Sequence, residues 1–514
     1  MGKVFGLSGV TLLSRILGLL RVRLEAEVLG GGAVASAWYL AFSFPNLLRR
    51  LFGEGALGTA LMPIVAELEA KYGRDHARGA LAVVFPCLGI LLALIVILCS
   101  VAALVIGNLE LNYRLRLVCV LTPLLMPYAI FICLTGVMTA VVNYAGSFLK
   151  AAFYSLSMNI FLVGGLVWGW CTQAGRTPAS LEQFLTVLSI LFLVSGVVQF
   201  GLMCFQLKAV HFTPDFSAWK EHTGVLKKLY KLALPGFIGA SALQISFLID
   251  RNLAFYVNEQ GVAALTIVDR LIDLPIGLFA VAMGQVFMAR MSAFAASGQL
   301  EELKRDLNYG LRQVWFLALP LGAGVVFFHE LLLKVICLGG RYTMNDLDAA
   351  RTVAIFYGCG IPFFCALKIL QPAFYARKEM KIPLYCSLIA IGANVILSLA
   401  LIRPLAHGGI ALATSVSSLL QCLLLAAALK RSGITVDIFT VVPSLLRALL
   451  ASAAAGVGTK LLLDRFYTGS GRLWDCCALC ASGMIFGVIY LTVSVLSRSR
   501  ETGEFLERFR KKSA

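Results

Sequence analysis

Charged side chains are scarce in this chain. Asp, Glu, Lys and Arg make up 14% of the 514 residues, whereas 59% are hydrophobic, and the mean hydropathy is +0.86. Soluble proteins carry about 25% charged residues, so this composition excludes a water-soluble globular fold. No polar stretch is long enough for a sizeable soluble domain. We expect an all-α polytopic membrane protein, because helices satisfy their backbone hydrogen bonds within lipid.

Three further absences narrow the function. The first apolar run contains arginines and no small-residue cleavage site follows it, so we expect no removable secretory signal. The densest cysteine group, at residues 476–480, lacks His or further Cys at metal-ligand spacing. The short outer loops hold one close acid pair, Asp346 and Asp348, whereas a membrane glycosyltransferase needs acid pairs and polar loops outside the membrane. We expect a transporter and not an enzyme, with no metal and no cofactor beyond an energy source.

Apolar runs separated by charged or Gly/Pro-rich breaks predict about 14 spanning helices. An even number places both termini on one side, and that side carries more than twice as many Lys and Arg as the other. Both termini are therefore expected in the cytoplasm. Because these cations lie in short loops beside membrane lipids, they also explain the net charge of +17 without nucleic acid. The predicted spans are residues 7–29, 35–69, 80–106, 117–143, 150–170, 181–207, 225–257, 262–293, 309–336, 350–376, 382–402, 407–429, 440–463 and 474–497.

An internal repeat relates the two halves of the chain, because landmarks recur in order at one constant offset. It predicts an N-terminal lobe at residues 1–208, a C-terminal lobe at 209–431, and two additional helices with a cytoplasmic tail at 432–514. Aligning Gly58 with Gly284 requires an insertion of about one helical turn after Pro45 in the first half. The matching landmarks are Arg21, Gly31 and Pro45 in the first half and Arg251, Gly261 and Pro275 in the second.

Several cations fall within the predicted spans, where a charge costs at least about 2.5 to 3.5 kcal/mol at mid-bilayer. Such groups should face a wet interior or a partner. Most lie in four helices that the repeat relates, which predicts one positively charged cavity between the halves. The cations are Arg15, Arg21, Arg23, Arg49, Arg50, Arg251, Arg270, Lys368 and Arg447.

Local ion pairing is the alternative for some of these cations. Arg21 has Glu25 one turn on, and Arg23 has Glu27. Arg251 and Arg270 also have neighbouring aspartates, which are Asp250, Asp269 and Asp273.

The adjacent pair Arg49 and Arg50 is harder to explain by packing, because Glu54 can neutralise at most one of them. These four helices hold more arginines than acids, and the excess is in the first half. An anion would relieve that excess. Guanidinium groups suit phosphate because they bind it bidentately.

At this point two segments identify a family. Residues 14–18 (SRILG), with Arg21, and residues 44–56 (FPNLLRRLFGEGA) closely resemble the MurJ (MviN) family of lipid II flippases in the MOP exporter superfamily. The resemblance continues through residues 62–63 and 269–277, and so covers essentially the whole chain.

The resemblance implies a V-shaped transporter of 14 helices in the bacterial cytoplasmic membrane. By alternating access it would flip undecaprenyl-pyrophosphate-linked peptidoglycan precursor, lipid II, from the inner to the outer leaflet. The last two helices would form a groove for the lipid tail, and cell-wall synthesis enzymes are the implied partners. The implied substrate residues are Arg21, Arg49, Arg50 and Arg270, with Arg15 and Glu54 in support and Arg251 as the repeat counterpart of Arg21.

Two departures from the family pattern concern acidic residues. Ser36 stands where many members have an acid. Some members bind sodium, and Asp250, Asn394 and Thr414 match that cation site, but Ser398 stands where an acid is expected. Either Na⁺ or the membrane potential is therefore the expected energy source.

Two alternative functions stay open. One is a flippase for another polyprenyl-pyrophosphate glycan, which differs only in substrate. The other is a drug or cation antiporter of the same superfamily, which would need a cavity dominated by carboxylates; the cationic excess disfavours it.

Overall fold

The computed structural model describes residues 2–53, 56–109, 112–172, 177–215, 224–467 and 471–504. Within these ranges the regular structure is helical, apart from an isolated backbone bridge between Gly339 and Tyr342. The predicted all-α fold is confirmed. The chain forms two compact units, Met1–Phe255 with Gly339–Tyr342, and Tyr256–Leu338 with Thr343–Ala514.

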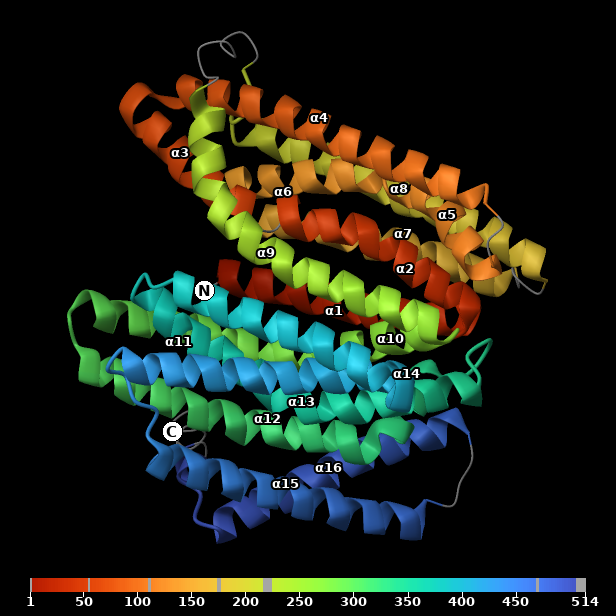
Figure 1. The fold of residues 1–514 in the computed structure, drawn as a ribbon, viewed down its shortest axis with the longest axis vertical. Coiled ribbons are helices and arrows are strands. Elements are labelled where there is room, and N and C mark those ends of the chain that lie inside the picture. The colour runs from red at the N-terminus through yellow and green to blue at the C-terminus, as the bar shows by residue number, and fades with distance from the viewer. Residues whose placement is uncertain are drawn as a thin grey trace. The chain divides into compact units, whose positions relative to one another are not determined.

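The first unit is a bundle of long helices (Figure 1). In it α1 packs on α7, α2 packs on α5, and α8 packs on α6 and α7. Its helices are α1 (Gly2–Leu29), α2 (Ala33–Leu48), the π-helical turn η1 (Arg49–Gly53), α3 (Ala56–Tyr72), α4 (Arg74–Gly107), α5 (Tyr113–Leu125), α6 (Tyr128–Tyr144), α7 (Phe148–Cys171), α8 (Pro178–Ala209) and α9 (Gly224–Val257), the last of which ends at the boundary between the units.

The second unit is also a helical bundle (Figure 1). In it α13 packs on both α12 and α14, and α15 and α16 pack on α12. Its helices are α10 (Gly261–Pro275), the π-helical turn η3 (Ile276–Ala280), α11 (Val281–Ala296), α12 (Leu300–Cys337), α13 (Met344–Ala376), α14 (Lys381–Arg431), α15 (Ile438–Phe466) and α16 (Arg472–Leu496).

Among the described residues, seven helices are long and apolar enough to cross a membrane, and the bent pair α5 and α6 is an eighth candidate. The seven are α4, α8, α12, α13, α14, α15 and α16. On α4 the side chains of Leu94, Ile97 and Leu98 are exposed, as expected of a helix whose solvent is lipid. The chain is thus a multi-pass membrane protein, and the figure of about 14 crossings stays a prediction.

Each repeat proline is followed by a π-helical turn. Pro45 lies near the end of α2, which runs into η1, and Pro275 ends α10, which runs into η3. The stretch between η1 and α3 includes residues 54 and 55, which lie outside the described residues. The insertion of about one helical turn in the first half therefore stays a prediction.

Two predicted spans, 382–402 and 407–429, form the single element α14, which breaks at Ala406 (φ 49°, ψ −135°). The imidazole of His407 fixes this reversal. Its Nε2 lies 2.7 Å from the backbone oxygen of Ala349, and its Nδ1 lies 2.8 Å from Nδ2 of Asn258. One side chain thereby joins three segments at one end of the second unit.

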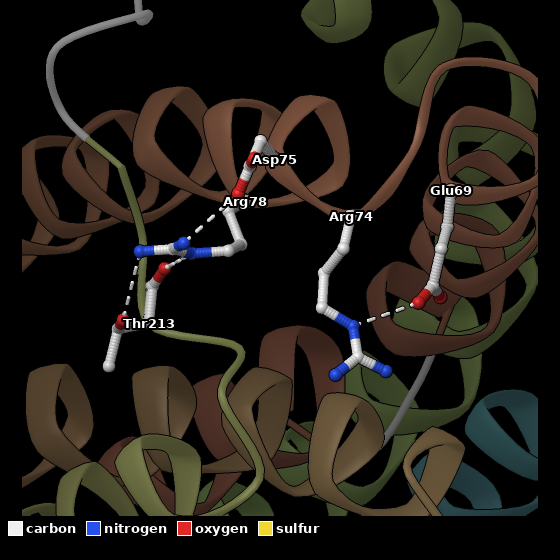
Figure 2. Close-up of polar contacts among 5 residues, drawn as sticks. All are labelled: Glu69, Arg74, Asp75, Arg78 and Thr213. Carbon is white, nitrogen blue, oxygen red and sulfur yellow. Dashed lines mark hydrogen bonds and ion pairs between the residues drawn. The ribbon is translucent and has the colours of Figure 1, made fainter.

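The segment that follows α8 contacts the first turns of α4 (Figure 2). Nε of Arg78 donates to the backbone oxygen of Thr213 at 2.9 Å, and its Nη1 reaches Asp75 at 3.1 Å. The guanidinium of Arg74 lies 4.8 Å from the ring centroid of Phe212, which is buried. The path of the chain up to residue 215 is therefore set by the first unit.

The helices α15 and α16 are held against α12 by close contacts. The hydroxyl of Tyr490 donates to the backbone oxygen of Phe316 at 2.6 Å. A Cβ added at Gly456 on α15 would lie 2.1 Å from the ring of Phe327 on α12, so only glycine permits this approach. The two predicted additional spans are thus integral to the second unit.

Candidate functional site

The buried arginine of α1 is Arg21, which is 7% exposed. Its Nε lies 3.6 Å from Oε1 of Glu25, one turn further along the helix. The guanidinium carbon also lies 5.9 Å from the ring centroid of Phe42 on α2. Glu25 is 1% exposed and accepts a hydrogen bond of 3.1 Å from the hydroxyl of Tyr39 on α2. Arg21 therefore lies between a carboxylate and an aromatic ring.

Arg23 also lies on α1 and pairs with Glu27, one turn further along, at 2.6 Å. Both side chains are partly exposed, which fits local ion pairing. Arg15 lies more than a turn before Arg21 and is half-buried. The structure thus separates the α1 arginines by environment, with Arg21 the buried one.

The adjacent arginines Arg49 and Arg50 begin the π-helical turn η1. The amide of Asn46 orients the first of them, because its Nδ2 donates to the backbone oxygen of Phe42 while its Oδ1 accepts from Nε of Arg49 at 3.2 Å. A π-helical turn inside an α-helix is a frequent feature of functional sites. Glu54, predicted in support, lies outside the described residues.

A backbone contact fixes the position of this turn. A Cβ added at Gly136 on α6 would lie 2.2 Å from the backbone oxygen of Gly53 and 2.6 Å from its Cα. The π-helical turn therefore rests directly on the α6 backbone, with no side chain between them. Backbone atoms cannot change rotamer as side chains do, so this contact holds the turn closely in place. A shift of α6 would move η1 with it, because close-packed interiors transmit strain.

Arg50 reaches α9. Its Nη1 lies 3.4 Å from Oε1 of Gln244, and its guanidinium carbon lies 5.4 Å from the ring centroid of Phe247. The guanidinium of Arg251, one turn on in α9, lies 4.6 Å from the same centroid. Arg251 is 4% exposed. One aromatic ring thus serves two cations, whose charges it stabilises through its electron-rich faces.

Five of the predicted substrate residues therefore belong to the first unit. Arg21, Arg49, Arg50 and Arg251 are held there by named contacts, and Arg15 lies on the same helix as Arg21. Of these, Arg50 and Arg251 meet at the ring of Phe247, and guanidiniums provide charge-assisted, bidentate donors that recognise phosphate oxygens.

The remaining arginine of the prediction, Arg270, is half-buried on α10 in the second unit, beside Asp269 and one turn before Asp273. Local ion pairing therefore stays open for it. Lys368 on α13 is exposed. Its backbone packs closely on Gly284 of α11, where an added Cβ would lie 2.6 Å from the Lys368 backbone oxygen. The cavity between the halves stays a prediction.

The predicted cation site is represented in the second unit by Asn394 and Thr414, whose Nδ2 and Oγ1 lie 3.2 Å apart. Ser398, one turn from Asn394, is fully buried. Asp250 belongs to α9 in the first unit. In the part of the chain that the structure describes, no group of three or more His, Cys, Asp and Glu side chains is arranged to hold a metal ion.

Sequence reasoning missed the aromatic and amide neighbours of the arginines. Phe247 precedes Arg251 by one helical turn, so its contact with that residue was readable from spacing. The contacts that Tyr39, Phe42 and Gln244 make join different helices, and no local spacing predicts them.

An apolar pocket lies between α15 and α16 in the second unit. Its walls are mostly apolar and include one indole. The lining includes Leu462, Leu463, Phe466, Trp474, Ala478 and Ile485.

Comparisons with known proteins agree with this architecture. The family model described as lipid II flippase MurJ matches residues 25–473. A probable lipid II flippase MurJ from Rhizobium tropici is 31% identical over 88% of this chain and 85% of its own length. A lipid II flippase MurJ from Burkholderia cenocepacia is 29% identical over 83% of each chain.

Solved structures share the fold. A lipid II flippase MurJ in an inward closed conformation aligns with a TM-score of 0.79 and 24% identity, covering 96% of this chain and 98% of that one. An inward-facing multidrug resistance MATE transporter of the MOP superfamily aligns with a TM-score of 0.69 and 14% identity, covering 81% and 95%. These likenesses concern the helical fold, and the family model and the curated relatives identify the family. The chain belongs to the MurJ family of lipid II flippases.

Proposed function

We propose that this protein flips lipid II, the undecaprenyl-pyrophosphate-linked peptidoglycan precursor, from the inner to the outer leaflet of the bacterial cytoplasmic membrane. One observation carries the proposal. In the first unit of a membrane-embedded fold Arg21 and Arg251 are buried, and Arg251 shares the ring of Phe247 with the exposed Arg50. A lipid with a diphosphate provides the anion that such a cluster needs, and membership of the family supports this substrate.

In the proposed mechanism, Arg49, Arg50 and Arg251 bind the diphosphate with Arg21, and Arg15, Glu54 and Arg270 support the head group. Planar guanidiniums offer several hydrogen-bond donors, so one arginine can bind a phosphate bidentately and the phosphate can exchange between neighbouring arginines. The polyprenyl tail stays in lipid, and the apolar pocket between α15 and α16 supports a groove for it. Alternating access of the two halves then exposes the head group outward.

We propose the membrane potential as the driving force, with Na⁺ at the Asn394 and Thr414 region as the alternative. Because the cytoplasm is electrically negative, moving a negative charge outward across the membrane is favourable by about 2.3 kcal/mol per charge per 100 mV. The excess of Lys and Arg in loops on the side of the termini supports cytoplasmic termini. Cell-wall synthesis enzymes that consume the flipped lipid are the proposed partners.

A drug or cation antiporter is the second candidate, because a MATE transporter shares the fold. Such a substrate needs a carboxylate-rich site, whereas the described first unit gathers guanidiniums. A flippase for another polyprenyl-pyrophosphate glycan would use the same chemistry. Accumulation of lipid II after depletion of this protein separates it from both.

The test is complementation in a strain depleted of its own lipid II flippase. Arg49→Ala with Arg50→Ala should abolish growth and cause lipid II to accumulate in the inner leaflet. Arg305→Ala is the matched control, since Arg305 is 76% exposed and pairs with Glu302 at the surface. Full complementation by the double variant would refute the assignment. Flipping in proteoliposomes with imposed K⁺ or Na⁺ gradients then separates the two energy sources.

A further inference from the structure

The carboxylate of Glu25 occupies an unusual position in the first unit. It is almost completely buried, within 3.6 Å of the Arg21 guanidinium, and the hydroxyl of Tyr39 donates to its other oxygen at 3.1 Å. Two helices thus contribute to its surroundings, α1 through Arg21 and α2 through Tyr39. Burial of a carboxylate is costly unless it is paired and hydrogen-bonded, and Glu25 meets both conditions.

The neighbouring pair on the same helix provides a comparison. Arg23 and Glu27 have the same one-turn spacing, are 2.6 Å apart and are each about one-sixth exposed. Arg21 and Glu25 are much less exposed, yet their closest atoms are a full ångström further apart. At 3.6 Å the contact is Coulombic and is too long for a hydrogen bond. Through this contact Glu25 compensates the charge of Arg21 at a distance beyond that of a hydrogen bond.

We propose that Glu25 is an internal counter-anion, which the diphosphate of the substrate displaces from Arg21 and which takes Arg21 back on release. This inference rests on the proposed function and assigns Glu25 as a positioning residue for it. A phosphate can form short bidentate bonds to Arg21, and these outcompete the long contact with Glu25. Tyr39 keeps the carboxylate in place while Arg21 is engaged elsewhere.

Two consequences follow for the transport cycle. In the empty protein the Arg21–Glu25 pair carries no net charge, so Arg21 adds no uncompensated buried charge while the empty protein reorients. In the loaded protein the carboxylate lies near a second anion, and their repulsion weakens binding of the diphosphate. Glu25 therefore lowers the affinity for the diphosphate and speeds its release. Without this repulsion the bound state would be more stable, and turnover would be slower.

The experiment compares Glu25→Gln with wild type in the full-length protein. Binding of inorganic pyrophosphate is measured by calorimetry in detergent, and flipping of fluorescent lipid II is measured in proteoliposomes. The neutral variant should bind pyrophosphate about tenfold more tightly, in the range of site-to-site coupling, and should flip more slowly at saturating lipid II. Glu27→Gln is the matched control and should change neither quantity. In an Arg21→Gln background, Glu25→Gln should give no gain in affinity.

A purely structural role predicts a different pattern, in which Glu25→Gln lowers the thermal midpoint and pyrophosphate binds equally or less tightly. That result overturns the proposal. If the Gln variant does not fold, Glu25→Asp retracts the carboxylate by one methylene and should tighten binding by a smaller factor; unchanged binding by the Asp variant also overturns it. The two claims fail separately. Absence of wild-type lipid II flipping counts against the proposed function, whereas tighter pyrophosphate binding by the Gln variant would still support the counter-anion.

Discussion

Substitution of Gly136 by alanine should disable transport from a position that bears no charge. The added Cβ would lie 2.2 Å from the backbone oxygen of Gly53, and real Cβ contacts are essentially never under 3.0 Å. The η1 turn must therefore move from α6 by most of an ångström. Overpacking of this kind costs about 1–3 kcal/mol, of which the better helix propensity of alanine returns at most about 1 kcal/mol.

The functional cost should exceed the loss of stability, because η1 carries Arg49 and Arg50. A displacement of about 1 Å in a binding constellation can reduce a rate about 100-fold. Lipid II flipping in proteoliposomes and thermal unfolding in detergent measure the two effects. The control is Gly58→Ala on α3, whose Cβ would meet only the Cβ of Ala140, at 3.4 Å. A Gly136→Ala protein that flips at the wild-type rate would show that the backbone contact does not position the arginines.

Three further substitutions test other contacts. Phe247→Leu removes the ring beneath Arg50 and should weaken pyrophosphate binding several-fold, since cation–π contacts contribute about 0.5–2 kcal/mol; unchanged binding in calorimetry would contradict this. His407→Ala should lower the thermal midpoint, because two hydrogen bonds of about 1 kcal/mol each are lost at the α14 reversal; a wild-type midpoint would show that they contribute little. Gly456→Ala should loosen α15 from α12 by overlap with Phe327 and increase proteolysis of the C-terminal region, whereas wild-type resistance would refute it.

Much of the fold could be predicted because lipid imposes simple rules on a sequence. Long apolar runs become helices, and the described parts of the predicted spans are helical except at residues 126–127, where the span 117–143 breaks between α5 and α6, and at residue 497, just past α16. What the sequence could not indicate is the π-helical hydrogen bonding of η1 and η3, because it depends on packing, such as that of η1 on α6, rather than on local propensity.

The candidate site could be predicted only as a set of cations. The cost of burying charge identified Arg21, Arg49, Arg50 and Arg251 as residues that need a partner. Which partner each one meets is a property of helix packing. Spacing along one helix predicts the pairing of Arg21 with Glu25, whereas the shared ring of Phe247 requires α9 and η1 to be neighbours.

The division of the chain into compact units bears on how the protein can be made in pieces. The first unit continues through Phe255, so α9 folds with the helices that precede it, although the repeat begins a new half near residue 209. A cut after α9 keeps that helix with α1–α8, although it separates the Gly339–Tyr342 segment, which belongs to the first unit, from Glu27, whose backbone oxygen accepts from the amide of Arg341 at 2.9 Å. Fragments that separate between α8 and α9 would deprive Arg50 of Gln244 and Phe247 until they reassociate. Split reporters and segmental isotope labelling should therefore be joined between α9 and α10.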